Sequence, residues 1–316
     1  MKKLTNKNIT RKEKDSAWKW ILSLYFRQFM ELCWKERAKE INWNKKPKFL
    51  DKELMKITKD AAIGNRLVDK LIEVELINGN LCYVLIHLEI QATKRDDFSQ
   101  RMFVYRYRLR DVYNMPIASM AILLDNDISW RPTIYSESLW DSEISIRFPI
   151  IKLIDYNKDI QKLEQSTNPF SIIILAQLAA LKKEKPELKL ASKVQITRKL
   201  YALNYSKNEV LALFKFIDWI IVLPKAGETE YMKTVATLDQ EEFEKFEKNF
   251  ICPAEQIWLE RGIERGMDLG IERGTINTTK KIAKKMLNKT GMSIAEIAEI
   301  TGISFEKLEK LKENTH

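Results

Sequence analysis

The sequence predicts an α/β protein whose strands and helices mix in the first half and whose second half is helical. Two runs of alternating apolar and polar residues, 68–77 and 81–91, flank an Asn-Gly-Asn turn at 78–80, which is typical of a β-hairpin. A continuous apolar run at 115–124 predicts a buried strand of the same sheet. Helical spacing of apolar residues prevails from Lys158 onward. We therefore expect an α/β sandwich followed by all-α C-terminal regions.

Length and charge narrow the class of protein. The chain has 316 residues, of which 45% are hydrophobic, so it has room for a core domain and smaller modules. We expect a core with N-terminal helices over 1–155, a helical support region over 156–250 and a helical interaction module over 251–316. The net charge of +10 favours a polyanion such as DNA as the partner.

Cysteine and histidine usage excludes several kinds of chemistry. Cys33, Cys82 and Cys252 are an odd number at wide spacings, which argues against a disulfide framework and a zinc knuckle and fits a reducing cytoplasm. Only His87 and His316 are available for histidine-based catalysis. The basic, polar N-terminus lacks the apolar centre of a signal peptide, and no stretch reaches about 18 uninterrupted apolar residues, so we expect no membrane partner.

Two helices are expected before the hairpin. Asp15 is positioned to cap the first helix, whose apolar and aromatic residues recur at helical spacing as far as Phe29. The second is expected over 49–58. Asp51 and Glu53 fall in its first turn, where acidic side chains complement the helix dipole.

The loop of the hairpin decides which residues of its two strands face each other. A three-residue loop at 78–80, in which Gly79 or Asn80 supplies the positive φ, is a common arrangement for such a turn. This loop places Asp69 directly opposite Glu89. We therefore expect the two side chains on one face of the sheet, roughly 5 Å apart.

Two carboxylates at this separation need either a shared proton or a cation between them. Asp69 and Glu89 repel each other when both are ionised, and a divalent ion removes the repulsion. Carboxylate oxygens, with the Ile90 backbone carbonyl as a third ligand, suit Mg²⁺ or Mn²⁺ better than zinc. The alternative is a solvated sheet face on which these two residues are ordinary surface charges.

A helix over 98–113 is expected to follow the hairpin. Its apolar side is formed by Phe98, Met102, Tyr105 and Leu109. Arginines occupy much of the remaining surface, and guanidinium groups bind phosphate through two hydrogen bonds at once. Two further strand-like runs are expected, around 131–135 and 145–151.

Several segments around these positions resemble one family, the recombination-promoting, transposase-associated nucleases of the PD-(D/E)XK superfamily. The similar segments are 49–54, 66–70, 85–91, 98–105, 130–132 and 168–170. Asp69 followed by Glu89-Ile90-Gln91 at the end of the next strand looks like the nuclease motif in its ExQ form. The resemblance implies a restriction-endonuclease-like core over the first half of the chain.

The resemblance also assigns roles at the metal site. Asp69 and Glu89 match the metal-binding carboxylates, and Gln91 stands where the superfamily more often has lysine. A helix ahead of the hairpin often supplies another acid in this superfamily, so Asp51 or Glu53 is a further metal candidate. Lysine would contribute a positive charge, whereas glutamine can only orient the attacking water by hydrogen bonds. The metal ion would therefore carry more of the activation.

The resemblance implies a Mg²⁺-dependent or Mn²⁺-dependent DNA endonuclease. Arg101 matches the family's arginine and is our candidate for binding the DNA phosphate, with Arg108 as a second candidate. The alternative is a DNA-binding or assembly protein that keeps the nuclease fold without its activity, because Gln91 replaces lysine and no proline precedes Asp69.

The C-terminal region contains glycines at every fourth position, Gly262, Gly266, Gly270 and Gly274. They form either a flexible linker or a helix stripe that permits close packing, and we favour helix packing, for which a second copy of the chain is one candidate partner. The segment 293–304 resembles the first half of a helix-turn-helix. Its following helix lacks arginine and asparagine for base contacts, so we expect an interaction module in preference to a DNA reader.

Overall fold

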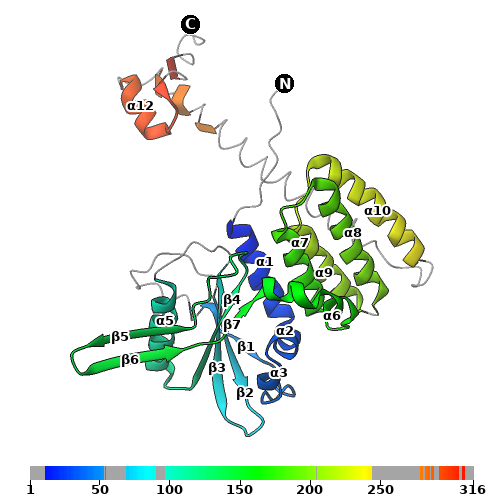
Figure 1. Cartoon of the computed structure of the whole chain (residues 1–316). Helices are drawn as coiled ribbons and strands as arrows, with labels where there is room; N and C mark the ends of the chain where they lie inside the picture. Colours follow the sequence, from blue (N-terminus) through cyan, green and yellow to red (C-terminus); the bar gives the residue numbers. More distant parts are fainter. Residues whose placement is uncertain are drawn as a thin grey trace. The chain divides into compact units, whose positions relative to one another are not determined.

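The structure of the chain is a computed structural model (Figure 1). It describes residues 11–52, 54, 69–89, 97–203 and 205–243, and towards the C-terminus residues 278–279, 282–284, 286–287, 292–305 and 308–309. The backbone alone is described for residues 11–15, 69, 87–89 and 239–243. The chain divides into two compact units, residues 1–254 and 255–316, and each is described by itself.

Among the described residues, five strands form the central sheet, in the order β1-β2-β3-β4-β7. They are β1 (Lys48–Phe49), β2 (Asp69–Glu75), β3 (Leu81–Glu89), β4 (Ile117–Leu123) and β7 (Ile150–Lys152). The first three are antiparallel neighbours, whereas β3, β4 and β7 run parallel. The mixed α/β class is confirmed, and so is the buried strand expected at 115–124.

Helix α5 (Phe98–Tyr113) connects β3 to β4 and covers one face of the sheet (Figure 1). A helical crossover is required here because the two strands are parallel. The bounds match the expected helix, and all four residues of its predicted apolar side are buried. Tyr105 and Leu109 pack in one cluster with Leu85 of β3, while Met102 packs in a second cluster with Ala121 of β4.

Helices α1 (Arg11–Leu24), α2 (Phe26–Cys33) and α3 (Lys35–Ala38) precede the sheet. The Phe26 ring lies 6.2 Å from the Phe49 ring, so α2 lies against β1. Two expectations are wrong here. Asp15 lies inside α1 and is not its cap, because the polar residues from 11 onward already belong to the helix. Phe49 belongs to β1, so the helix expected over 49–58 begins later, at Asp51.

The helices that follow the sheet begin at Leu153 and include those expected beyond Lys158. They are η1 (Leu153–Asp159, a 3₁₀ helix), α6 (Ile160–Gln165), α7 (Phe170–Leu181), α8 (Pro186–Ala202), α9 (Lys207–Ile220) and α10 (Lys225–Phe243). Helix α7 is apolar on all sides because it is buried among its neighbours. Gln177 of α7 accepts a hydrogen bond from the Trp18 indole at 3.0 Å and donates one to the Leu124 carbonyl at 3.4 Å. This side chain joins α1 to the end of β4.

Strands β5 (Ile134–Leu139) and β6 (Ser142–Arg147) form a separate two-stranded hairpin. The sequence predicts strands near 131–135 and 145–151 but not their pairing with each other. Only β7, the end of the second run, joins the central sheet. Figure 1 shows the β5–β6 hairpin extending past α5, away from the central sheet.

The C-terminal unit contains α12 (Ile294–Thr301), which starts with a Ser293–Glu296 capping box and ends at Gly302. Ala283, Ile297 and Leu308 form its small core. The apolar spacing of this segment predicts packing of Ile297, Ile300 and Leu308. Ile297 and Leu308 are buried as expected, whereas Ile300 is exposed. The four regularly spaced glycines lie outside the described residues. Across the described part of both units, no helix has the length and apolar character needed to cross a bilayer.

Candidate functional site

The turn of the β2–β3 hairpin determines how its strands pair. The Leu76 amide donates to the Asn80 carbonyl at 2.8 Å, and the Gly79 amide donates to the Leu76 carbonyl at 2.9 Å. The three-residue loop is therefore 77–79, and the expected loop at 78–80 is wrong by one residue. Gly79 has a φ of +83°, which confirms it as the residue that supplies the positive φ.

The pairing of the strands consequently differs from the expected register by two residues. Asp69 lies opposite His87, so its expected direct pairing with Glu89 is wrong. A shift of two residues keeps every position on its original face, because side chains alternate with a period of two. Positions 69, 87 and 89 therefore still share one face. Position 89 becomes the diagonal neighbour of position 69, at about 7–8 Å between backbones.

The shared face is the one that α5 covers. Leu71 and Leu85 lie on this face, two residues from positions 69 and 87, and both pack in the cluster that includes Tyr105 of α5. On the opposite face, the side chains of Val84 and Ile86 are buried as well. The hairpin thus lies between two layers. The candidate carboxylate positions lie next to a buried stretch of the sheet face that packs on α5.

Arg101, the expected phosphate contact, lies on the sheet-facing side of α5. Its side chain is nearly buried, with 8% of the residue exposed. The neighbouring Met102 packs in the same cluster as Leu123, and Leu123 is the β4 partner of Glu89. The first two turns of α5 therefore cover the part of the sheet that carries position 89. Arg101 belongs to this segment of α5 and is buried there.

The other arginines of α5 are arranged differently. Arg108, the second phosphate candidate, is half-buried, whereas Arg106 and Arg110 are exposed. The Arg106 Nε donates to the Ile117 carbonyl at 3.2 Å, which ties this side chain to the start of β4. The solvent-facing side of α5 therefore carries positive charge, as the sequence predicts.

Asp51, a further metal candidate, is the counterion of a buried lysine. Its Oδ2 accepts a hydrogen bond from Lys70 Nζ at 2.5 Å, and the same ammonium group donates to Ser23 Oγ. Lys70 is adjacent to Asp69 in β2, so it points to the opposite face of the sheet. Asp51 is therefore bound on the face away from position 69. Its Oδ1 is buried without a hydrogen-bond partner among the described residues.

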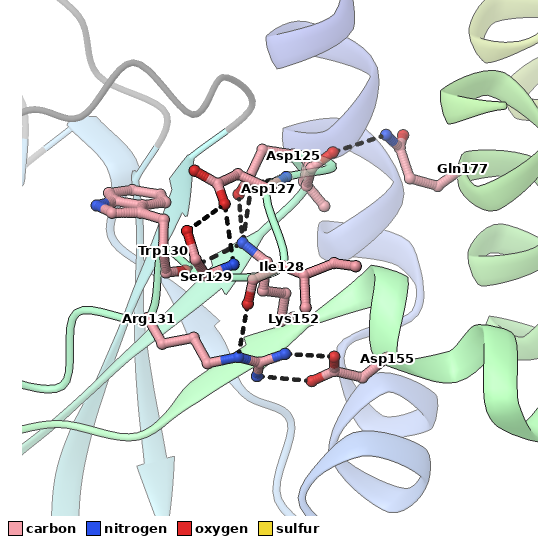
Figure 2. Close-up of polar contacts among 10 residues, drawn as sticks. Asp125, Asp127, Ile128, Ser129, Trp130, Arg131, Lys152, Asp155 and Gln177 are labelled. Carbon is pink, nitrogen blue, oxygen red and sulfur yellow. Dashed lines mark hydrogen bonds and ion pairs between the residues drawn. The ribbon is translucent and has the colours of Figure 1, made fainter. Parts of the chain in front are cut away.

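A second polar cluster lies where β4 and β7 end (Figure 2). Lys152 donates to both carboxylate oxygens of Asp125, at 2.8 and 3.0 Å, and to the Trp130 carbonyl at 3.1 Å. The lysine and aspartate side chains are buried. A buried ion pair is tolerated when its polar atoms are hydrogen-bonded, and three acceptors satisfy the three protons of this ammonium group.

The loop after β4 is held by an ion pair and by hydrogen bonds within the loop. Arg131 forms a two-point ion pair with Asp155, at 2.8 and 2.6 Å, and these hydrogen bonds lower the pKa of the Asp155 carboxyl. Hydrogen bonds from Ser129 lower the pKa of Asp127. The segment 130–132, one of those that resemble the nuclease family, thus has a structural role in closing this end of the sheet. Sequence reasoning missed this cluster, although Asp125 directly follows a buried strand.

Among the described residues, no three or more histidine, cysteine, aspartate or glutamate side chains gather to hold a metal ion. Most side chains of the metal site expected from the sequence are not among those that the structure describes. Glu53, Ile90 and Gln91 lie outside the described residues, and Asp69 and Glu89 are described by their backbone alone. What the structure provides for this site is therefore the pairing of β2 with β3 and the position of α5.

Comparison with models of known protein families, with curated proteins and with solved structures gave no significant match for this chain. The likeness to the recombination-promoting nucleases consequently rests on the sequence segments. The fold that the structure adds is a mixed α/β arrangement with a helical C-terminal half.

Proposed function

We propose that the chain is a metal-dependent DNA endonuclease that hydrolyses phosphodiester bonds. The observation that carries this proposal is the β2–β3 register, in which Asp69 and Glu89 occupy the same face as diagonal neighbours. Diagonal positions remain within reach of long side chains. Glutamate has one methylene more than aspartate, which helps the pair to span the longer diagonal separation. An ion held between the two would also offset their mutual repulsion.

The available donors fit a hard divalent cation. Asp69 and Glu89 would hold Mg²⁺ or Mn²⁺ through carboxylate oxygens, with the Ile90 carbonyl as a third ligand. When bound, such an ion lowers the pKa of a coordinated water and neutralises charge on the phosphate. Asp51 is a weaker candidate because Lys70 occupies one of its oxygens on the other face of the sheet. Gln91 would orient the attacking water by accepting or donating a hydrogen bond.

Arg101 is the chain's own candidate for holding the phosphate. It belongs to the first two turns of α5, where the neighbouring Met102 packs with Leu123, the β4 partner of position 89. Burial of Arg101 would strengthen the attraction between its guanidinium and an anion, because the local dielectric is low. Two parallel hydrogen bonds to phosphate oxygens would fix the backbone of the DNA. The exposed Arg106 and Arg110, on the outer side of α5, would add attraction to the polyanion at longer range.

A second candidate function is DNA binding or assembly without cleavage. Two observations favour it: Gln91 replaces the usual lysine of the motif, and Asp51 is engaged by Lys70. A chain of this kind would bind DNA through phosphate contacts, and its affinity would fall steeply with rising salt. It would show no dependence of binding on Mg²⁺.

Plasmid nicking in the presence and absence of Mg²⁺ separates the two functions. The full chain should convert supercoiled plasmid to open circles only with the divalent ion. Asp69→Asn and Glu89→Gln should each slow nicking by at least about 100-fold, since each removes a charged ligand of the ion. Arg101→Lys should weaken nicking by a smaller factor, because lysine keeps the charge but loses the two-point contact.

The matched control is Glu187→Gln, which removes one exposed carboxylate from the first turn of α8, away from the sheet. It should nick at the wild-type rate. Nicking by Asp69→Asn at that same rate would remove the proposed site. Salt-sensitive DNA binding without nicking in either Mg²⁺ or Mn²⁺ would instead establish the second candidate function.

A further inference from the structure

The outer end of the β5–β6 hairpin exposes an apolar surface. The strand register places Tyr135, Ile146, Ile144 and Leu139 on one face of the hairpin, together with Glu137 and Ser142. Exposure rises along this face from 7% at Ile146, which packs with α5, to 45% at Ile144 and 68% at Leu139. Trp140, in the turn, is 94% exposed. We call Leu139, Trp140 and Ile144 the hairpin tip.

Tryptophan is an unfavourable choice for this turn if only this chain's folding matters. Trp140 has a φ of +53°, in the left-handed region where a side chain costs about 1–2 kcal/mol. Its ring is almost wholly exposed, so the strain is not offset by burial within the chain. Large apolar side chains gathered on an exposed surface mark interaction sites, and strained residues cluster at such sites.

The charge around the hairpin tip identifies the chemistry of its partner. Residues 137–143 contain Glu137, Asp141 and Glu143 and no basic residue. Residues 134–147 as a whole hold these three acids and Arg147, a net charge of −2, so the rest of the chain carries +12 to give the total of +10. An apolar surface surrounded by acids repels nucleic acid and attracts a basic protein surface.

We propose that the hairpin tip docks on the basic body of a second copy of this chain. Each copy then offers both an acidic, apolar arm and a net positive body, which satisfies the requirement of a two-fold dimer that the same patches meet twice. Pairing of the two tips with each other is disfavoured, because it brings six carboxylates together. This contact is independent of the glycine-containing C-terminal segment and of nuclease activity.

Sedimentation velocity of the full chain over a range of concentrations tests the contact. The triple variant Leu139→Ser/Trp140→Ser/Ile144→Ser should raise the dimer dissociation constant at least about tenfold, as expected when apolar anchors of an interface are removed. Glu137→Gln/Asp141→Asn/Glu143→Gln should weaken the dimer and reduce its salt dependence. Ile128→Ser, which removes an equally exposed apolar residue outside the hairpin, should leave the dimer unchanged.

A photo-crosslinking amino acid at position 140 identifies the occupant. In an equal mixture of isotopically light and heavy chains, cross-links from position 140 should join a light to a heavy copy at residues within 1–254. Unchanged dissociation by the triple variant, or the absence of mixed cross-links at dimer-forming concentrations, would overturn the proposal. Cross-links to an added DNA duplex in place of a second chain would overturn it in favour of DNA. Equal thermal midpoints of the variants and wild type show that all of them fold.

Discussion

The two hairpins of this protein follow the same local rules but differ in what covers them. Each is an antiparallel pair whose turn contains a residue with positive φ, Gly79 in one and Trp140 in the other. The β2–β3 hairpin has a neighbouring strand on each side and buried residues on both faces. The β5–β6 hairpin has no further strand among the described residues and is largely exposed. The burial of each hairpin thus follows from the neighbouring elements that cover it.

Composition already reflects this difference. The middle of β3 is apolar at successive positions, Tyr83, Val84, Leu85 and Ile86, as expected for a strand buried on both faces. In β5 and β6 three of the six residues on one face are serines, at 136, 138 and 145. A serine face can remain solvated, whereas an apolar face needs a partner. The apolar face of the outer hairpin has such a partner only at its base, where it packs on α5.

The largest expected effect contrasts one leucine from each hairpin. Leu85→Ala should lower the free energy of unfolding of residues 1–254 by about 2–5 kcal/mol, because it leaves a cavity in the cluster beneath α5. Leu139→Ala should change it by less than about 0.5 kcal/mol, since the side chain is exposed. Both changes in stability can be measured by urea unfolding that is monitored through hydrogen exchange of individual peptides, at concentrations where the chain is monomeric. Equal losses would contradict the comparison.

A smaller loss of stability is expected when a carboxylate beside the β2–β3 hairpin, Asp51, is removed. Asp51→Ala leaves the ammonium group of Lys70 without its counterion in a buried place and should cost about 1–3 kcal/mol, the range for an unsatisfied charged hydrogen bond. The cost is below that of a fully buried pair because Asp51 is partly exposed to water. The same unfolding measurement applies.

Glu137→Ala is the matched control on the outer hairpin. Glu137 accepts a hydrogen bond from the Tyr135 hydroxyl, but both residues lie at the surface, so the expected change is under about 0.5 kcal/mol. A loss as large as that of Asp51→Ala would mean that polar contacts stabilise the outer hairpin, contrary to the contrast between a covered and an exposed hairpin.

Local patterns were sufficient to predict α5 and β4, because each has a long and consistent apolar period or run. The register of the β2–β3 hairpin was not predictable from the same kind of signal. Ile77 is apolar and continues the alternation, yet it belongs to the loop, where its amide donates to the Glu40 carbonyl. A contact with residues near position 40, far from the hairpin in sequence, therefore helps to set where β2 ends.

The candidate site was predictable as a face but not as a set of distances. Alternation along β2 and β3 assigns positions 69 and 89 to one side of the sheet, and a register shift of two residues leaves this assignment unchanged. The role of Asp51 depends on Lys70 and Ser23, which are brought together by packing of α1 on the sheet. No local pattern contains that information. The proposed roles of Asp69, Glu89 and Arg101 in cleavage remain predictions for the nicking assay.

The last comparison concerns the two turns, where the expected changes in stability have opposite signs. Gly79→Ala should lower the stability by about 1–2 kcal/mol, because alanine is strained at a positive φ. No clash adds to this cost, since a Cβ at position 79 has no atom within 4 Å. Trp140→Gly should stabilise the monomer by up to about 1 kcal/mol, since glycine relieves the positive φ and little burial is lost. The gain is partial because glycine also increases the entropy of the unfolded chain. Hydrogen exchange of β2 and β5 peptides measures the two changes, and a destabilising Trp140→Gly would show that the tryptophan contributes to folding of its own chain.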